Sequence, residues 1–137
     1  MEKCRVIVDT NLWISLLIGK KLAELRILCN HQNISVYNCK ELTDEFIKVA
    51  SRPKIRKYVT EQNIADISQL MEVSCLYNSI NTTAVSIIRD TKDLYLLSLA
   101  DTVKANYIIT GDNDLLVLKR HNNTQIVTFS EFMAKIS

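Results

Sequence analysis

Glycine and proline are scarce in this chain, with two Gly and one Pro among 137 residues. This composition leaves few residues for turns and predicts a chain that is mostly helix and strand. Two glycines cannot build a glycine-rich phosphate-binding loop. The four cysteines contain no Cys-x-x-Cys pair, so the spacing of a metal–thiolate site is absent. We expect free thiols in a reducing cytoplasm.

Long apolar runs and a dominant charge are also absent. No segment approaches the roughly 20 apolar residues of a membrane-spanning helix. Glu2 and Lys3 lead directly into a short strand, and we expect no signal peptide. Seventeen basic and fifteen acidic residues give a net charge of +2, too small to indicate nucleic acid by itself. The length and the 47% hydrophobic content predict a single domain, residues 1–137, with no membrane contact.

Segments with strand-like and helix-like periodicity alternate along the chain. Compact apolar runs predict strands at 6–8, 34–37, 107–109 and 125–129, and weaker ones at 76–80 and 85–88. Apolar spacings of three and four predict helices at 12–17, 20–30, 39–50, 94–104 and 131–135, and a further helix carrying the apolar stripe 64–71. The alternation favours an α/β fold, a three-layer α/β/α sandwich with a central parallel sheet and right-handed crossovers.

Helix ends are predicted from side chains that can cap them. Thr60 is expected to cap the helix with the 64–71 stripe, although Asn63 replaces the Glu or Gln of a full capping box. Asp90 is the expected cap of the helix 94–104, and Ser130 that of the helix 131–135. The residues 121–123 are expected to form a polar turn.

Carboxylates stand where the predicted strands end and the helices begin. Asp9 follows the strand 6–8, Asp112 follows the strand 107–109, Asp93 opens the helix 94–104, and Glu45 lies one turn into the helix 39–50. In a parallel sheet such junctions open on the same edge, so we expect these acids to converge. A hard cation such as Mg²⁺ or Mn²⁺ relieves their mutual repulsion, and such a site supports phosphodiester hydrolysis.

Each acid also has a purely structural interpretation. Asp9 could cap the helix that follows it, and Asp93 could complement a helix dipole. Glu45 could be a solvated surface residue, and Asp112 and Asp114 could simply form a turn. The residues alone leave both interpretations open.

Four segments, in the same order along the chain, resemble those of a known family. They are 6–15 (Val-Ile-Val-Asp-Thr-Asn-Leu-Trp-Ile-Ser), 41–54, 89–100 and 107–116. With these segments the chain resembles the PIN domain family, in the branch of toxin components of toxin–antitoxin systems such as virulence-associated protein C. The resemblance implies an α/β/α sandwich and a metal-dependent ribonuclease site, with an antitoxin as a further partner.

The same resemblance implies roles for individual residues. Asp9, Glu45, Asp93 and Asp112 would form the catalytic acidic quartet that binds Mg²⁺ or Mn²⁺. The accessory residues would be Asp114 as a further metal-site acid, and Thr10, Asn11 and Thr110 as the supporting shell. The family often has another acid directly after the position of Asp93, where this chain has Leu94.

A basic run follows the helix that carries Glu45. Its residues, Arg52, Lys54, Arg56 and Lys57, would contact RNA phosphates, or they simply form a solvated surface. Trp13 and the five tyrosines could stack on bases, although Trp13 is better placed for core packing. His31 and His121 suggest no catalytic pair.

Two other functions compete with the nuclease prediction. A phosphatase of similar topology would use an aspartyl nucleophile with a second Asp two residues later, but position 11 is Asn. A PIN-like nucleic-acid-binding scaffold could keep the acids without turnover. Few charges interrupt the apolar stripe 64–71, which favours a homodimer formed through helix faces.

Overall fold

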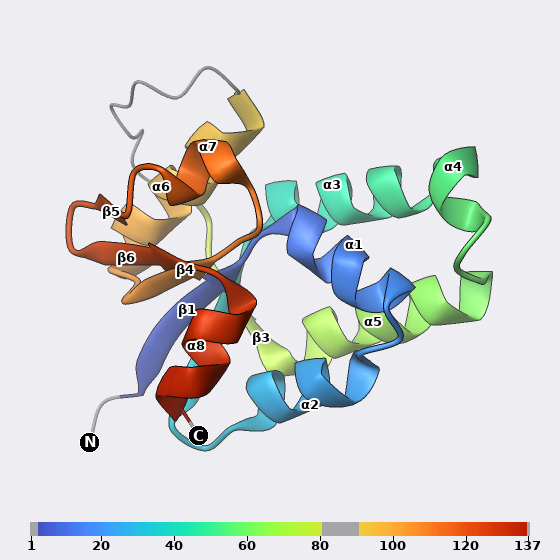
Figure 1. Ribbon diagram of the computed structural model, residues 1–137, viewed down its shortest axis with the longest axis horizontal. Coiled ribbons are helices and arrows are strands. Elements are labelled where there is room, and N and C mark those ends of the chain that lie inside the picture. The colour runs from blue at the N-terminus through green and yellow to red at the C-terminus, as the bar shows by residue number, and fades with distance from the viewer. Residues whose placement is uncertain (1–2, 81–90, 137) are drawn as a thin grey trace.

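The computed structural model describes residues 3–80 and 91–136, except for the side chains of residues 91–93. A six-stranded sheet forms its centre, in the order β3-β2-β1-β4-β6-β5 (Figure 1). The strands are β1 Cys4–Val8, β2 Ile34–Asn38, β3 Cys75–Tyr77, β4 Tyr107–Ile109, β5 Arg120–His121 and β6 Thr124–Val127. Neighbouring strands pair in parallel, except for the antiparallel pair β5 and β6.

β1 is a central strand of the sheet, between β2 and β4. Its residues Val6, Ile7 and Val8 are 0%, 0% and 1% exposed. A strand that is covered on both faces has no need to alternate apolar and polar residues, and this explains the unbroken β-branched run. The predicted central parallel strand is confirmed.

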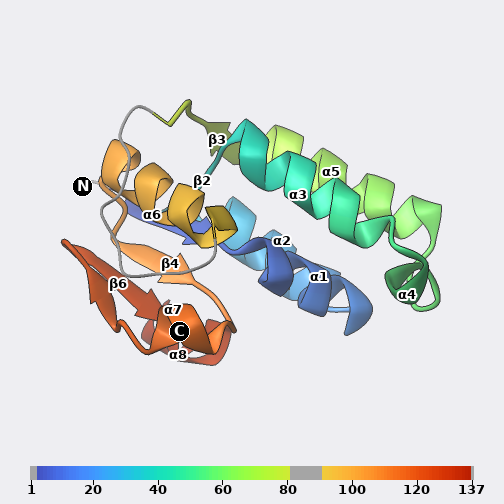
Figure 2. The same ribbon diagram turned by 90° about the horizontal axis from the view of Figure 1, so that it is seen from above.

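Helices cover both faces of this sheet. They are α1 Thr10–Ile18, α2 Leu22–Asn30, α3 Lys40–Ala50, α4 Pro53–Arg56, α5 Glu61–Ser74, α6 Thr91–Val103, α7 Asn113–Leu116 and α8 Phe129–Ile136. α2 packs on β2 and α5 on β3, whereas α6 packs on β1 and β4. Figure 2 shows α1, α2, α3 and α5 grouped together and α6 standing apart from them. The predicted three-layer sandwich is confirmed.

α3 illustrates how the apolar spacing fixes a helix against the core. Leu42, Phe46 and Val49 are buried and lie four and seven residues along the helix, so they share one face. Glu41 and Asp44, which lie off this face, are exposed. This orientation leaves Glu45 half-buried at the border between the two faces.

The apolar stripe of α5 faces the interior, and the prediction that it joins two subunits is wrong. Ile67 and Met71 are both 0% exposed and Leu70 is 8% exposed, because the stripe packs into the protein's own core. The stripe 64–71 is therefore not available to a second subunit. The start of α5 has a complete capping box, since the Asn63 side chain accepts the N–H of Thr60 at 3.0 Å.

The structure differs from the sequence predictions at two further places near the C-terminus. The cap of α8 is Thr128 rather than Ser130: the Thr128 hydroxyl accepts the N–H of Glu131, and the Glu131 carboxylate accepts the N–H of Thr128, each at 3.1 Å. Thr-x-x-Glu is itself a capping-box pattern. Arg120 and His121 form the short strand β5 where the sequence predicted part of a turn, and β5 pairs with β6 as a hairpin.

Other predictions concern segments that the structure describes only in part. The predicted strand 85–88 and the predicted cap Asp90 lie outside the described residues.

Trp13 is 1% exposed, so its predicted core role is confirmed. Within residues 3–80 and 91–136, no helix is both long enough and apolar enough to cross a membrane.

Candidate active site

Asp9 and Thr110 meet at the carboxyl edge of the sheet, because β1 and β4 are parallel neighbours. Asp9 follows β1 and is only 4% exposed, and Thr110 follows β4 and is fully buried. The Thr110 hydroxyl donates a hydrogen bond of 2.6 Å to Oδ2 of Asp9. A charge-assisted bond of this length fixes the carboxylate in one orientation.

Asp112 continues this polar unit along the turn after β4. Its backbone N–H donates to the Thr110 hydroxyl at 3.0 Å, and its Oδ1 accepts the N–H of Asp114 at 2.9 Å, which caps α7. Asp9 likewise caps α1 by accepting the N–H of Asn11 at 3.4 Å. The capping interpretation is therefore correct for Asp9, and Asp112, for which the structural interpretation was a turn, also caps a helix. Capping does not exclude a second role, since an ionised carboxylate has about four lone-pair sites.

Glu45 reaches the same region from α3, as the surroundings of Tyr95 indicate. Burial raises the pKa of Tyr95, the hydrogen bond with Thr10 lowers it, and the charges of Asp9 and Glu45 raise it. The Tyr95 and Thr10 hydroxyls are 3.2 Å apart. Asp9 and Glu45, from different elements, thus both lie near enough to Tyr95 for their charges to raise its pKa.

The remaining predicted site residues are not all joined to the Asp9–Thr110–Asp112 unit. The Asp93 side chain lies outside the described part of the structure, and its backbone belongs to the first turn of α6. Asp114 and Asn11 are exposed, whereas Thr10 is 3% exposed at the start of α1. Of the two acids in the turn after β4, Asp112 is the one that bonds directly to Thr110.

The chemistry of these side chains fits a hard divalent cation. Carboxylate and hydroxyl oxygens are the donors that Mg²⁺ and Mn²⁺ prefer. Cys39 also lies near Tyr95, but burial raises the pKa of its thiol to about 11, so it is neutral at pH 7 and a poor metal ligand. Among the side chains that the structure describes, no three acids, histidines or cysteines gather closely enough to hold a metal ion. The side chain of Asp93 is not among them.

Tyr95 is a residue of this region that the sequence did not reveal. It occupies a helix in which four of the five residues that follow it are buried apolar side chains, so it resembles one more core residue. The useful signal is its place two residues after Asp93, at the end of α6 that approaches Asp9. Only the fold shows that its hydroxyl meets Thr10.

The basic run lies beyond the far end of α3, as both ribbon views show (Figures 1 and 2). Arg52, Lys54, Arg56 and Lys57 are all exposed at or beside α4. The only ion pair of this run within the described residues joins Arg56 to Glu61 at 3.8 Å on the surface. Seven residues of helical rise separate Glu45 from Arg52, about 10 Å.

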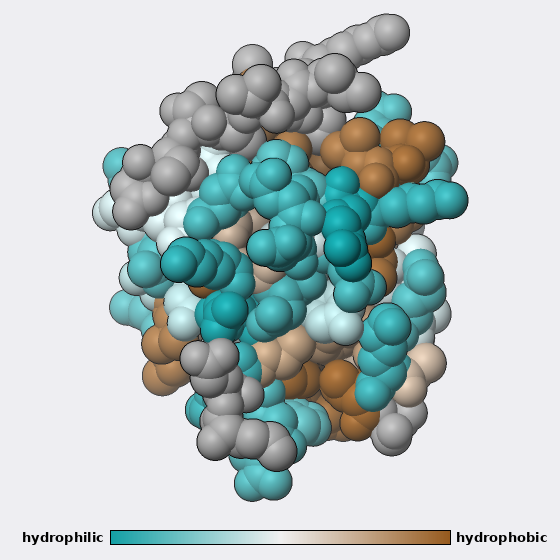
Figure 3. Space-filling view, turned by 90° about the vertical axis from the view of Figure 1, so that its left-hand side faces the viewer, coloured by the Kyte–Doolittle hydropathy of each residue, from teal (hydrophilic) through white to brown (hydrophobic). Residues whose placement is uncertain are grey.

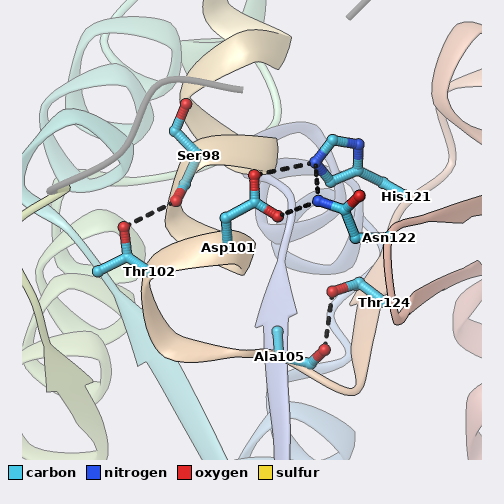
Figure 4. A network of polar contacts seen from close by, with 7 residues as sticks. All are labelled: Ser98, Asp101, Thr102, Ala105, His121, Asn122 and Thr124. Carbon is cyan, nitrogen blue, oxygen red and sulfur yellow. Dashed lines mark hydrogen bonds and ion pairs between the residues drawn. The ribbon is translucent and has the colours of Figure 1, made fainter. Parts of the chain in front are cut away.

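His121 has an acidic partner, although the sequence suggested no catalytic pair for it. Its Nε2 lies 3.1 Å from Oδ2 of Asp101, and the Asn122 amide donates to the other carboxylate oxygen at 2.8 Å (Figure 4). Asp101 stands near the end of α6, so the network ties that end to the β5–β6 hairpin. Figure 3 shows the side of the molecule that carries this hairpin, and its central surface is mainly hydrophilic. Asp101 lies near the opposite end of α6 from Asp93, and we assign the Asp101–His121 pair a structural role.

Comparison with known proteins agrees with this arrangement. A family model described as PIN domain matches residues 5–114, which include β1, the Glu45 helix and the acids of the turn after β4. No curated protein matches the chain. The matched segment is well over half of the 137 residues. The chain therefore belongs to the PIN domain family.

Proposed function

We propose that this protein is an endoribonuclease that depends on Mg²⁺ or Mn²⁺ and acts as the toxin of a toxin–antitoxin pair, with residues 1–137 forming one domain. PIN domains are in general metal-dependent nucleases. The observation that carries the proposal is the joined unit Asp9–Thr110–Asp112, with Glu45 acting on the same phenol as Asp9.

Asp9, Glu45, Asp93 and Asp112 would hold the metal, with Asp114 as an accessory acid at the rim. The cation supplies an activated water and neutralises the charge that builds on the phosphate. The Thr110 hydroxyl binds Oδ2 of Asp9 and the Asn11 N–H binds Oδ1, so both contacts fix the orientation of the carboxylate. Preorganised ligands of this kind save the free energy of reorganisation during the reaction.

Thr10 and Asn11 support the carboxylates from the first turn of α1. The Thr10 hydroxyl holds Tyr95 on α6, and the Asn11 N–H holds Oδ1 of Asp9. Asp93 and Tyr95 share the start of α6, so the Thr10–Tyr95 hydrogen bond ties that helix to the strand end that carries Asp9. Groups that orient metal ligands typically contribute about 10- to 100-fold to affinity or activity.

The test of this function is cleavage of mixed RNA substrates titrated with Mn²⁺ and Mg²⁺, against a chelator. We expect cleavage only with metal, together with a higher melting temperature at millimolar Mn²⁺, because the cation binds the folded chain alone. RNA binding with no cleavage at any metal concentration would instead support a PIN-like scaffold without turnover. If the protein neither cleaves nor binds RNA, and metal does not raise its melting temperature, both the nuclease and the scaffold function are excluded.

The basic run beside α4 is proposed to contact RNA phosphates, and its effect on salt dependence tests this. Changing Arg52, Lys54 and Arg56 together to Gln should weaken RNA binding and make the slope of log affinity against log salt shallower by about 2, because each phosphate that is no longer neutralised lowers the slope by about 0.7. The measurement is fluorescence anisotropy in chelator across a salt series. Stability should change little because the side chains are exposed.

A charge-matched control removes three cations elsewhere. Lys3, Lys119 and Lys135 are exposed, and changing them together to Gln lowers the net charge by the same amount. This control should leave the slope nearly unchanged. Equal effects of the two triple variants would show that net charge, and not the run beside α4, sets the affinity.

The proposed partners are an antitoxin protein and a second copy of this chain, in the cytoplasm. A homodimer would need an apolar surface other than the stripe 64–71, which the core occupies. Ile27 on α2, Val73 on α5 and Leu76 on β3 are 56%, 75% and 50% exposed, and their elements are neighbours at one edge of the sheet. This edge is the surface we propose for subunit pairing.

A further inference from the structure

A cavity of about 370 Å³ lies at the end of the edge strand β3. It is lined by Lys40, Glu41, Tyr77, Asn78, Ser79 and Ile80. β3 runs parallel to β2, and β2 to β1, so the cavity opens at the same sheet edge as Asp9. Two strand spacings separate β3 from β1, about 10 Å. A nucleotide close to a phosphate at the acids would therefore reach this cavity.

Tyr77 presents an aromatic ring in this cavity and is 46% exposed. Its hydroxyl lies 2.9 Å from the Thr43 hydroxyl on α3, the helix that begins beside β3 in Figure 2. The amide nitrogen of the buried Asn38 lies 3.5 Å from the same hydroxyl. These contacts anchor the polar tip of the side chain and restrict the ring before any ligand arrives. A ring that is already ordered loses less conformational entropy on stacking.

The charges around the cavity favour a neutral ligand group. Lys40 and Glu41 both line it and carry opposite charges, so the cavity as a whole does not select a phosphate. The Glu41 carboxylate accepts hydrogen bonds, while the Asn78 amide and the Ser79 hydroxyl can donate as well as accept. An unpaired nucleobase has a flat apolar face and an edge of donors and acceptors, which matches this lining.

We infer that the cavity at the end of β3 is a subsite for one unpaired base of the substrate strand, with the base stacked on Tyr77. The inference rests on the proposed nuclease function and adds to it a subsite that binds one base beside the acidic site. Duplex RNA cannot offer its base faces to the ring because they are stacked on each other.

Variants of Tyr77 test the stacking contact. Tyr77→Ala should weaken the binding of a short single-stranded RNA about 5- to 150-fold, the range found when a stacking aromatic is changed to alanine. Tyr77→Phe keeps the ring but loses the hydroxyl that anchors it, and should weaken binding less than Tyr77→Ala does. Tyr58→Ala is the matched control, because Tyr58 is 65% exposed but does not line the cavity. Binding is measured by anisotropy in chelator, and melting temperatures verify that each variant is folded.

A scan with abasic nucleotides gives a second readout that needs no variant to fold. One position of the RNA should lose affinity in the unaltered protein when its base is removed, and Tyr77→Ala should abolish the effect at that position only. A flat scan, equal affinity of Tyr77→Ala, or equal binding of duplex RNA would overturn the subsite. If metal-dependent cleavage persists in that case, only the subsite fails. If the protein neither binds nor cleaves RNA, the proposed function fails with it.

Discussion

Asp9→Asn is expected to lower RNA cleavage about a thousandfold at saturating Mn²⁺. The amide keeps the size of the side chain but removes the charge that a cation requires. A loss of about 4 kcal/mol of charge stabilisation, within the several kcal/mol that a bound metal supplies, corresponds to this factor. The variant should remain folded, since its amide oxygen can still accept one of the two hydrogen bonds that Asp9 now accepts from Thr110 and Asn11.

Asp44→Asn is the matched control for this result. Asp44 is an exposed acid directly before Glu45, so its substitution removes one negative charge close to the site without touching the Asp9–Thr110 unit. Single-turnover cleavage rates of both variants, measured beside their melting temperatures, separate a local effect from a general one. Equal rates for Asp9→Asn and Asp44→Asn would leave Asp9 as a helix cap alone.

Asp93→Asn is expected to reduce cleavage by a similar factor, and here the effect on stability carries as much information. If Asp93 only complements the dipole of α6, the change should cost about 0.5 kcal/mol and leave cleavage intact. If it belongs to the acidic site, the apo protein should be as stable as before or more stable, because a repelling charge has gone.

Both quantities are to be measured on one preparation, as denaturant unfolding in chelator and cleavage in Mn²⁺. Lost cleavage with unchanged or raised apo stability supports the role of Asp93 in the site. Retained cleavage with slightly lower stability would contradict it and leave the proposed mechanism with three acids.

The strands and most of the helices of this protein follow from local sequence. The unbroken run Val6-Ile7-Val8 can only be satisfied between two covered faces, and the spacing of Leu42, Phe46 and Val49 fits a helix with one buried side. The cap of α8 is also local, because Thr128 and Glu131 carry the pattern that Ser130 was expected to supply. The two-residue strand β5 is too short for any periodicity and exists only because β6 pairs with it.

For the site, the sequence alone determined that Asp9 and Asp112 end buried parallel strands, because a change from β-branched to acidic residues marks a strand end. Strand order then decided that β1 and β4 are neighbours, which brings Asp9 within 2.6 Å of Thr110, 101 positions away. The direction of the α5 stripe was also decided by the fold, since an apolar face does not specify whether the same chain or another one covers it. Tyr95 and Tyr77 meet Thr10 and Thr43 across distant segments, and such contacts leave no periodic signal in either segment.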